Sequence, residues 1–512
     1  MSAQPLAALK RDVNMDMHGF LQGMRPEIRF LAAEDREAIF QGALEVLFGV
    51  GMQVLHPEGL ELLRKGGCQV DEQSMVRIPA SLVSQALTTA PASIPVYDRL
   101  GEPAMDLGAT RSYFGTGSDL IYALDGQSFE RSVAGLNDVA RAARVCDALP
   151  NIDFVMSFAH PSDVSPHMAY LASFQTMAGN TTKPIVNTAE NRSDLTEICR
   201  IGSLLRGSNQ ALRERPYTIH YAEPISPLKH PFESVDKLLL CAQAGMPCIY
   251  SPAPMAGSTA PMSIAGHVVQ GLAESLCGLV MHQLKQPGAP FLMGMGAAVL
   301  DMVSSECSYN APEYYLSYMA MIEMSHHLDL PSWGYAGTSD SQIPDGQATY
   351  EAGMMSFLSA LSGANLNHDV GYLDFGRTGS LEMIVICNEI IGQIRRIQKG
   401  IPVDPSTLAL EVIAEIGPGG HYLMHEHTLD HVRGTQWRPK LFSRVGRDAW
   451  EAKGRLSLLD RAGQELESIL AGHQPEPIPR EIQSRIQEAV DGYASTFSAA
   501  SGQIESIRIQ RK

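Results

Sequence analysis

Four aromatic residues, each at the end of a short apolar run, are the first candidates for binding a ligand. They are Tyr221, Tyr250, Trp333 and Tyr335. Aromatic ring faces carry negative quadrupole charge, so several rings together can hold a quaternary ammonium ion. Glu223 would add Coulombic attraction. The rings could instead only fill the end of a barrel, and strand alternation could turn Trp333 outward. Both interpretations stay open from the sequence.

Polar residues end the neighbouring apolar runs. Asn187 ends one run, His220 precedes the end of the next, and His368 and Asp369 lie in the last. Asp369 is a second carboxylate that could face a bound cation. Active sites of closed parallel barrels lie at the carboxyl ends of the strands. We therefore expect these side chains to gather if the apolar runs are strands of one barrel.

The segment Gly417–Arg433, GPGGHYLMHEHTLDHVR, is rich in glycine and histidine. His421, His425, His427 and His431 follow at steps of four, two and four. Histidines four residues apart share a helix face, which is one arrangement for zinc. No HExxH motif is present, and no cysteine pair has ligand spacing, so we expect no metal bound by this chain. The alternative is a loop over the barrel mouth, with locally hydrogen-bonded imidazoles and glycines that permit close approach of a bulky partner.

Elements that would position these residues alternate strictly from about residue 106. The candidate strands are Ser112–Thr116, Ile152–Phe158, Pro184–Asn187, Tyr217–Ala222, Pro247–Ser251, Pro290–Met295, Ser332–Tyr335 and Leu366–Gly371. The candidate helices are Leu136–Ala148, Pro166–Ala178, Asp194–Leu205, Phe232–Ala244, Ser263–Leu284, Pro312–His327, Asp345–Ser362 and Ser380–Lys399. Strict alternation predicts a parallel sheet with helical crossovers.

Eight such units are the number that closes a barrel. The block Ser112–Lys399 is close to the usual barrel size of about 250 residues. An open, doubly wound sheet is the alternative, but no GxGxxG follows the first strand. We therefore predict an α/β protein with a TIM-like (βα)8 barrel over residues 106–400. An N-terminal helical segment (1–105) would precede the barrel, and a C-terminal extension (401–512), with a His- and Gly-rich loop and helices, would follow it.

Composition restricts the partners. The chain has 39 Lys and Arg against 56 Asp and Glu, for a net charge of −17. This balance argues against nucleic-acid binding and against binding an anionic membrane. The eight cysteines form no CxxC pair and the N-terminus lacks the apolar core of a signal peptide, which favours a cytoplasmic protein with reduced thiols. The apolar stretch Ser263–Met281 contains His267 and Glu274, which predicts a buried helix and no membrane span.

Three ordered motifs resemble one known family, the trimethylamine:corrinoid methyltransferases. The first comprises LHPEGLELLRKGG, VRIPASLVSQAL and APASIPVYDR near the N-terminus. The second is SDSQIPDGQATYEAGMMSFLSALSGANL, and the third is GPGGHYLMHEHTLDH with the later RPKLFSR. The resemblance covers nearly the whole chain. It implies a TIM-like barrel and transfer of a methyl group from a methylated amine to the cobalt of a separate corrinoid protein.

One departure from the family narrows the expected substrate. Trimethylamine-specific members insert pyrrolysine near the seventh strand end, whereas Tyr335–Gln347 contains only ordinary residues here. The chain therefore resembles the branch that acts on quaternary amines such as glycine betaine. A quaternary nitrogen already carries the charge that makes its methyl group labile, so the site needs positioning and desolvation rather than an acid. A cage that binds the cation too tightly would hinder transfer.

The resemblance also suggests which residues meet the substrate and the partner. The candidate substrate-binding residues are Tyr221, Glu223, Tyr250, Trp333, Tyr335, Asn187, His368 and Asp369. A betaine carboxylate would be held by His368, His220, Asn187 or backbone N–H groups. A corrinoid (cobalamin) on the cognate corrinoid protein would be the cofactor and partner, and homo-oligomers are expected. The candidate docking residues are Gly419, Gly420, His421, His425 and His427.

Other classes remain as alternatives. A zinc-dependent barrel methyltransferase for another methyl donor would need a metal, which an assay of the purified protein would detect. A non-catalytic betaine-binding protein would have the cage but pass no methyl group to reduced cobalamin. An amine demethylase that uses tetrahydrofolate directly would form methyl-folate without changing the cobalamin spectrum.

Overall fold

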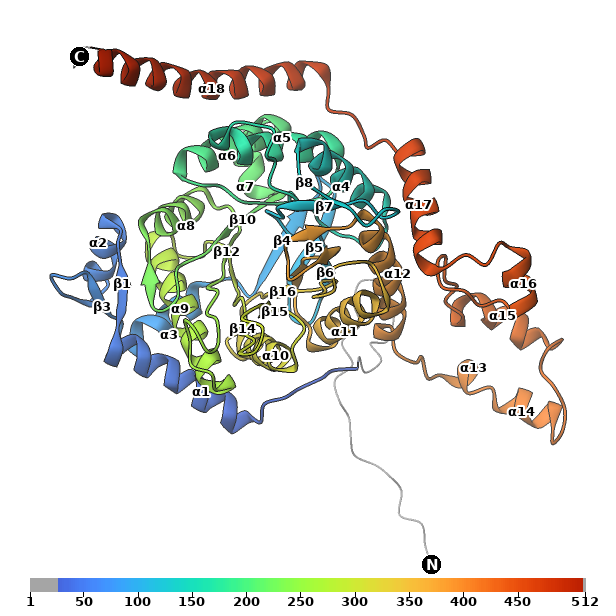
Figure 1. Cartoon of the computed structure of the whole chain (residues 1–512). Helices are drawn as coiled ribbons and strands as arrows, with labels where there is room; N and C mark the ends of the chain where they lie inside the picture. The colour runs from blue at the N-terminus through green and yellow to red at the C-terminus, as the bar shows by residue number, and fades with distance from the viewer. Residues whose placement is uncertain (1–25, 510–512) are drawn as a thin grey trace, which may run out of the picture.

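The structure is a computed structural model that describes the backbone of residues 26–509 and the side chains of residues 26–497. The first 25 residues of the predicted N-terminal segment lie outside the described residues. The described chain is a mixed α/β protein in which helices surround a set of short strands (Figure 1).

Seven of the eight predicted apolar runs form strands. They are β6 (Tyr113–Phe114), β9 (Ile185–Asn187), β10 (Thr218–Ala222), β12 (Cys248–Tyr250), β13 (Phe291–Met293), β16 (Trp333–Tyr335) and β17 (Leu366–His368). The remaining run, Ile152–Phe158, contributes two parallel bridges, from Phe154 to Gly115 and from Val155 to Ile185. It therefore lies between β6 and β9, as the order of the chain predicts.

Parallel pairing joins these segments in sequence order. β9, β10, β12 and β13 form one sheet, and Met293 of β13 bridges to Ser332, which precedes β16. β17 pairs with β16 on one side and with β6 on the other. The last segment thus lies beside the first, and the segments surround a common centre in Figure 1.

The predicted crossover helices are all present outside the strands. They are α4 (Leu136–Ala148), α5 (Ala169–Asn180), α6 (Arg192–Arg206), α8 (Phe232–Ala244), α9 (Ile264–Lys285), α10 (Pro312–His327), α11 (Gly346–Ser362) and α12 (Leu381–Gln398), with the short α7 (Asn209–Glu214) after α6. Caps fix several starts: the Asn191 side chain accepts hydrogen bonds from Ser193 and Asp194 N–H, and the Asp345 side chain accepts from Ala348 N–H. Among the described helices, α9 alone is long and apolar enough to cross a membrane, but 72% of its apolar window is buried, as expected for a core helix.

An antiparallel hairpin that the sequence analysis did not predict closes one end of the ring. Its strands are β4 (Ser93–Tyr97) and β5 (Pro103–Gly108), so the expected boundary after residue 105 falls inside β5. Ile94 and Leu107 belong to the same buried cluster as Ile219 in the ring interior. The Tyr97 N–H donates to the Pro216 carbonyl, just before β10, so the hairpin lies at the amino ends of the strands.

The N-terminal segment packs against the outside of α8 to α10 (Figure 1). Its elements are α1 (Ala33–Glu45), the π-helical turn η1 (Val46–Val50), β1 (Met52–Val54), α2 (Pro57–Lys65), β2 (Gln69–Val70), β3 (Met75–Arg77) and α3 (Ala80–Thr89). β1 pairs with β11 (Lys229–His230), which ties this segment to the loop after β10. Short hairpins follow other strands: β7 (Tyr122–Leu124) with β8 (Arg131–Val133), β14 (Val299–Leu300) with β15 (Cys307–Ser308), and β18 (Tyr372–Leu373) with β19 (Thr378–Gly379).

The C-terminal extension has two parts. α17 (Leu458–Gly472) packs on α12 and α4, and α18 (Arg480–Ile509) packs on α6. Before them, α13 (Pro405–Leu408), α14 (Leu410–Ile416), α15 (Glu426–Thr435) and α16 (Arg447–Ala452) contain no buried residue. Residues 401–435, here called the arm, project sideways from α12, away from the ring (Figure 1).

Candidate active site

Four aromatic side chains from three strands meet at one end of the ring of strands. Tyr221 lies in β10, Trp333 and Tyr335 lie in β16, and His368 lies in β17. These four residues are called the aromatic cluster. The centroid of Trp333 lies 4.0 Å from that of His368, and Tyr335 lies 4.4 Å from His368. Tyr221 lies 5.7 Å from Trp333. Pairing of Tyr335 with His368 in the β16–β17 register brings these residues together.

Trp333 faces the interior of the ring rather than the helices. It is 1% exposed and packs in the same buried cluster as Phe154, Ile219 and Leu366. The outward orientation that alternation allowed for Trp333 is therefore absent. Its indole Nε1 is buried and has no hydrogen-bond partner among the described residues. The indole could therefore offer a ligand its N–H as well as its aromatic face.

The imidazole of His368 is held in one orientation. Its Nδ1 lies 2.6 Å from the carbonyl oxygen of Gly334. A carbonyl only accepts hydrogen bonds, so Nδ1 carries the proton and Nε2 is left with its lone pair. Burial lowers the pKa of His368 to about 3. The ring is neutral at physiological pH, and a neutral ring can stack against a cation without charge repulsion.

Two carboxyl groups flank the aromatic cluster. The Tyr221 hydroxyl donates to Glu223 Oε2 at 2.8 Å, and Asp369 Oδ1 lies 3.4 Å from His368 Nε2. Glu223 lies at the exposed end of the cluster, yet the groups around its carboxyl still hinder solvation and raise its pKa, and the Tyr221 hydrogen bond partly opposes this effect. Burial raises the pKa of Asp369 well above its usual range. A cation placed between them would favour the ionised form of both groups.

Asp369 is held by unusual backbone geometry. Its φ angle is 76°, a left-handed conformation that Asp and Asn tolerate better than most residues. Gly117, which follows β6, lies close by: a Cβ on Gly117 would come 2.1 Å from Asp369 Oδ1 and 2.3 Å from the Tyr372 hydroxyl. The Gly115–Gly117 strand end therefore needs glycine at position 117 because the carboxyl group occupies the space of a side chain.

Two tyrosines near the cluster were missed by the sequence analysis. The negative charges of Asp369 and Glu223 both contribute to raising the pKa of Tyr309, after burial as the main cause. Tyr372 donates its hydroxyl to the Ser118 carbonyl at 2.5 Å, and Asp369 contributes to raising its pKa, again after burial. Tyr309 follows the short strand β15 and Tyr372 begins the short strand β18, and both strands are too short for apolar periodicity to give a signal.

Tyr250 and Asn187 are not brought to this cluster. In the β10–β12 register Tyr221 pairs with Ile249, whereas Tyr250 pairs with Ala222 and faces the helices. The Tyr250 hydroxyl lies 2.8 Å from His230 Nδ1, and its ring abuts Gly278 of α9. Asn187 Nδ2 lies 3.1 Å from His220 Nδ1. The register pairs these two residues on the face opposite Val186 and Ile219, so neither can hold a ligand in the ring interior.

The Gly- and His-rich segment lies in the arm rather than over the ring. Gly419 and Gly420 are exposed, as is His421. His425 caps α15 by accepting from the His427 N–H at 3.1 Å, and His427 stacks on His431 at 3.9 Å. The imidazoles therefore bond locally, but the expected position over the barrel mouth is not observed. The part of the chain that the structure describes contains no group of three His, Cys, Asp or Glu side chains placed to hold a metal ion.

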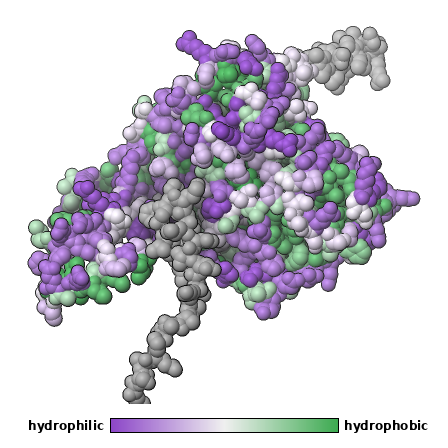
Figure 2. Space-filling model, turned by 180° about the vertical axis from the view of Figure 1, so that it is seen from behind, coloured by the Kyte–Doolittle hydropathy of each residue, from purple (hydrophilic) through white to green (hydrophobic). Residues whose placement is uncertain are grey.

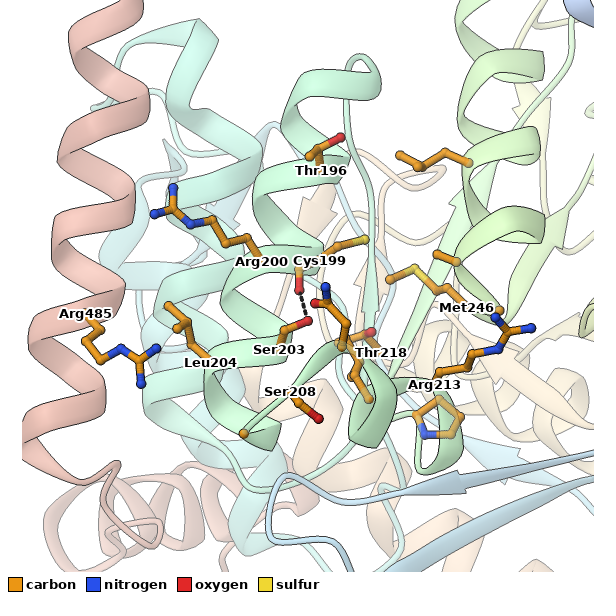
Figure 3. A pocket seen from close by; sticks show the side chains of 17 residues that line it. Thr196, Cys199, Arg200, Ser203, Leu204, Ser208, Arg213, Thr218, Met246 and Arg485 are labelled. Atoms are coloured by element: carbon orange, nitrogen blue, oxygen red, sulfur yellow. Dashed lines mark hydrogen bonds between the residues drawn. The ribbon is translucent and has the colours of Figure 1, made fainter.

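A separate cavity of about 670 Å³ lies among α6, α7, α8 and α18 (Figure 3). Arg200, Arg213 and Arg485 surround it, and Thr218 marks the start of β10 at its base. This cavity is on the helix side of the strands and has a cationic rim. Its charge is unsuited to a cationic amine, so the aromatic cluster is the better candidate for the reaction.

Comparison with known proteins identifies the family. The family model described as trimethylamine methyltransferase (MTTB) matches residues 5–495. The chain belongs to this family. It is 31% identical to trimethylamine methyltransferase MttB of Desulfitobacterium hafniense, over 91% of this chain and 94% of the relative. It is 29% identical to a glycine betaine methyltransferase of the same species, over 90% and 96%. This MTTB-family chain is therefore a methyltransferase enzyme.

A solved structure shares the fold. The monomethylamine methyltransferase MtmB of Methanosarcina barkeri aligns with a TM-score of 0.50 and 12% identity, over 86% of this chain and 89% of that one. At this identity the likeness concerns the fold alone. The MTTB-family chain thus shares an α/β architecture with this structure.

Proposed function

We propose that this methyltransferase moves a methyl group from a quaternary methylamine, the class that includes glycine betaine, to Co(I) of a corrinoid carried by a separate protein. The product would be a tertiary amine. The observation that carries the proposal is the aromatic cluster itself, in which Trp333 stacks on a neutral His368 beside two carboxyl groups. Rings and carboxylates together are the groups that recognise a permanent cation.

Methyl transfer from a quaternary amine requires little of the protein except that it position the donor. The C–N bond breaks and its electron pair stays on nitrogen, so the ammonium becomes a neutral tertiary amine. The methyl carbon bonds to the Co(I) nucleophile, whose electron pair forms the new bond. No proton moves. Residues of the cluster bind the cation, orient one methyl group outward and exclude water, which strengthens the effect of fixed charges.

The neutral state of the cluster suits this step. His368 cannot serve as a proton donor at Nε2, because that nitrogen carries no proton. A quaternary amine needs no such donor, because its nitrogen already carries the charge that makes a methyl group labile. The aromatic rings and the two carboxyl groups suit a donor of that charge. The corrinoid would enter as the second substrate, and the partly exposed Tyr221 and exposed Glu223 mark the side from which the cluster is reached.

We propose that the ring of strands is a TIM-like (βα)8 barrel. The unbroken series of parallel pairings supports this, because β17 pairs with β6 and so returns the series to its start. In such a barrel the catalytic residues lie at the carboxyl ends of strands. Tyr221, Tyr335 and His368 each lie at or near such an end.

We propose that copies of this chain associate through the arm, and that Gly419–His427 meets the corrinoid protein in the resulting assembly. The arm exposes a run of apolar side chains: Ile401, Val403, Leu408, Leu410, Ile413, Tyr422, Leu423, Met424 and Leu429. Figure 2 shows such apolar patches on the arm, which projects at the left. An apolar hollow of about 920 Å³ beside Phe48 and Val50 supplies a complementary surface on a second copy. Contiguous exposed apolar side chains of this kind favour an interface. The unpaired cysteines fit a reducing compartment such as the cytoplasm.

The proposal is tested with purified protein, chemically reduced cobalamin and a panel of methylated amines. Methylation of cobalamin is followed by absorbance, and the demethylated amine is identified by mass spectrometry. Formation of methylcobalamin with a stoichiometric tertiary amine supports the proposal. Cation binding without any transfer would instead favour a non-catalytic binding protein, and a requirement for zinc would favour metal-dependent chemistry.

A further inference from the structure

We infer that the site prefers quaternary donors that have no carboxylate next to the cationic nitrogen, so that choline is a better methyl donor than glycine betaine. This inference rests on the proposed function and names the substrate class within it. The two compounds share the trimethylammonium head. They differ in the tail, which is a neutral hydroxyl group in choline and a carboxylate in glycine betaine.

The charge of the site favours a donor without a carboxylate. Glu223 and Asp369 are the acidic groups at the two ends of a continuous series of contacts: Glu223 to Tyr221, Tyr221 to Trp333, Trp333 to His368, and His368 to Asp369. Among residues 26–497, no Lys or Arg forms an ion pair with either carboxyl group. Charge on both is thus left for the ligand to balance.

The side chains that were expected to hold a substrate carboxylate are turned away from the cluster or already paired. His220 and Asn187 face the helices and bond to each other. His368 faces the cluster, but its only N–H already donates to the Gly334 carbonyl at 2.6 Å, and burial lowers its pKa to about 3. His368 therefore offers the cluster no free N–H and no positive charge, and the unpartnered Nε2 of His220 lies on the helix side of the strands. The unpartnered Trp333 N–H is a neutral donor and brings no positive charge to offset the two carboxyl groups.

Glu223 and Asp369 respond differently to the two ligands. Loss of solvation raises the pKa of both carboxyl groups, although Glu223 lies at the exposed end of the cluster. A trimethylammonium head favours ionisation of these groups and gains attraction from it. The carboxylate of glycine betaine lies only two bonds from the nitrogen, so it would oppose that ionisation and add repulsion. A longer tail would place its carboxylate farther away, and γ-butyrobetaine should therefore be intermediate.

The experiment measures kcat/KM for cobalamin methylation with choline, γ-butyrobetaine and glycine betaine, and the affinity of each donor by calorimetry. We expect choline to exceed glycine betaine by about tenfold or more in both measurements. Equal or better values for glycine betaine would overturn the inference while leaving the proposed function intact. Absence of transfer from all three donors would defeat the proposed function, and the affinities would still decide the preference. Absence of binding by all three would overturn both.

Paired variants test whether Glu223 sets the preference. Glu223→Gln keeps the acceptor for the Tyr221 hydroxyl but removes the charge, so the choline to glycine betaine ratio should fall several-fold. A merely structural role would lower both rates and leave their ratio unchanged, which would contradict the inference. Glu467→Gln, on the exposed side of α17, is the matched control and should leave the ratio as in the wild type.

Discussion

Trp333 lies almost parallel to His368, with ring centroids 4.0 Å apart and an angle of 24° between the rings. The indole belongs to β16 and the imidazole to β17, and the parallel register of these strands brings them together. Because burial lowers the pKa of His368 to about 3, this stack is uncharged. It therefore presents aromatic surface to a ligand and leaves the positive charge to the substrate.

Replacing Trp333 by Phe should weaken binding of quaternary cations. An indole is the best of the aromatic partners for a cation, and such contacts contribute about 0.5–2 kcal/mol. We expect the dissociation constant for choline to rise about 2- to 30-fold in calorimetry. Trp437→Phe, on the C-terminal extension, is the matched control and should bind choline normally. Unchanged affinity in Trp333→Phe would exclude the indole from the cation site.

Replacing Asp369 by Asn should stabilise the protein and weaken cation binding. Burial raises the pKa of this carboxyl in the folded chain, so the stability it contributes is lost as pH rises above the unfolded-state pKa of 3.8. Asn tolerates the φ angle of 76° and carries no charge. Thermal unfolding should therefore show a larger gain at pH 8 than at pH 5. A gain independent of pH, or one shared by the exposed Asp430→Asn control, would contradict this account.

Three buried histidines should make the fold sensitive to acid. Burial lowers the pKa of His230, His282 and His368 to about 3 each. Below pH 6.5 the unfolded chain binds protons that the folded chain does not, so the free energy of unfolding should fall as pH falls from about 6.5 towards 3. Each such histidine contributes a slope of about 1.4 kcal/mol per pH unit. Denaturant titrations between pH 4.5 and 7 measure this slope, and His282→Asn should reduce it.

Replacing His421 by Ala should weaken transfer to protein-bound corrinoid. His421 is exposed on the arm and lies outside the aromatic cluster, so the chemistry at the donor should be intact. We expect a several-fold lower rate with the corrinoid protein and an unchanged rate with free cobalamin. His473→Ala serves as a control outside the arm. Equal effects on both acceptors would argue against docking at this residue.

Charges introduced on the arm should reduce the size of the assembly. Leu423 is 75% exposed and Met424 is 79% exposed, so replacing either by Asp should leave the folded chain intact. We expect light scattering to report smaller particles for Leu423→Asp and for Phe48→Asp, because these residues lie on the two surfaces proposed to meet. Val303→Asp, at a 95% exposed loop position, is the control. Unchanged mass in the arm variants would remove the arm from the interface.

Alternation of strands and helices was predictable because each βα unit repeats the same apolar pattern. All eight crossover helices lie where the sequence analysis placed them. The β4–β5 hairpin was not predicted, because it is stabilised by contacts that are distant in the sequence. Ile94, for example, packs in the interior of the ring of strands in the same buried cluster as Ile219. Local periodicity carries no information about such contacts.

The candidate site was predictable only in part. Tyr221, Glu223, Trp333, Tyr335, His368 and Asp369 do gather, because parallel strands end at the same edge. Tyr250 fails to join them because its register partner is Ala222 rather than Tyr221, and one step along a strand turns a side chain to the opposite face. Tyr309 comes from a loop, where no period exists to place it. The position of the arm could not be predicted, because it depends on the surfaces that the arm contacts and not on its own sequence pattern.

The central claim is that a permanent positive charge on the donor nitrogen replaces acid catalysis by the protein. Its most direct test compares initial rates of cobalamin methylation from choline and from uncharged trimethylamine, with the free base held constant across pH 7 to 9. We expect transfer from choline alone, with little dependence on pH. Equal rates from the free tertiary amine would contradict the account, because a permanent positive charge on the donor would then not be required for transfer.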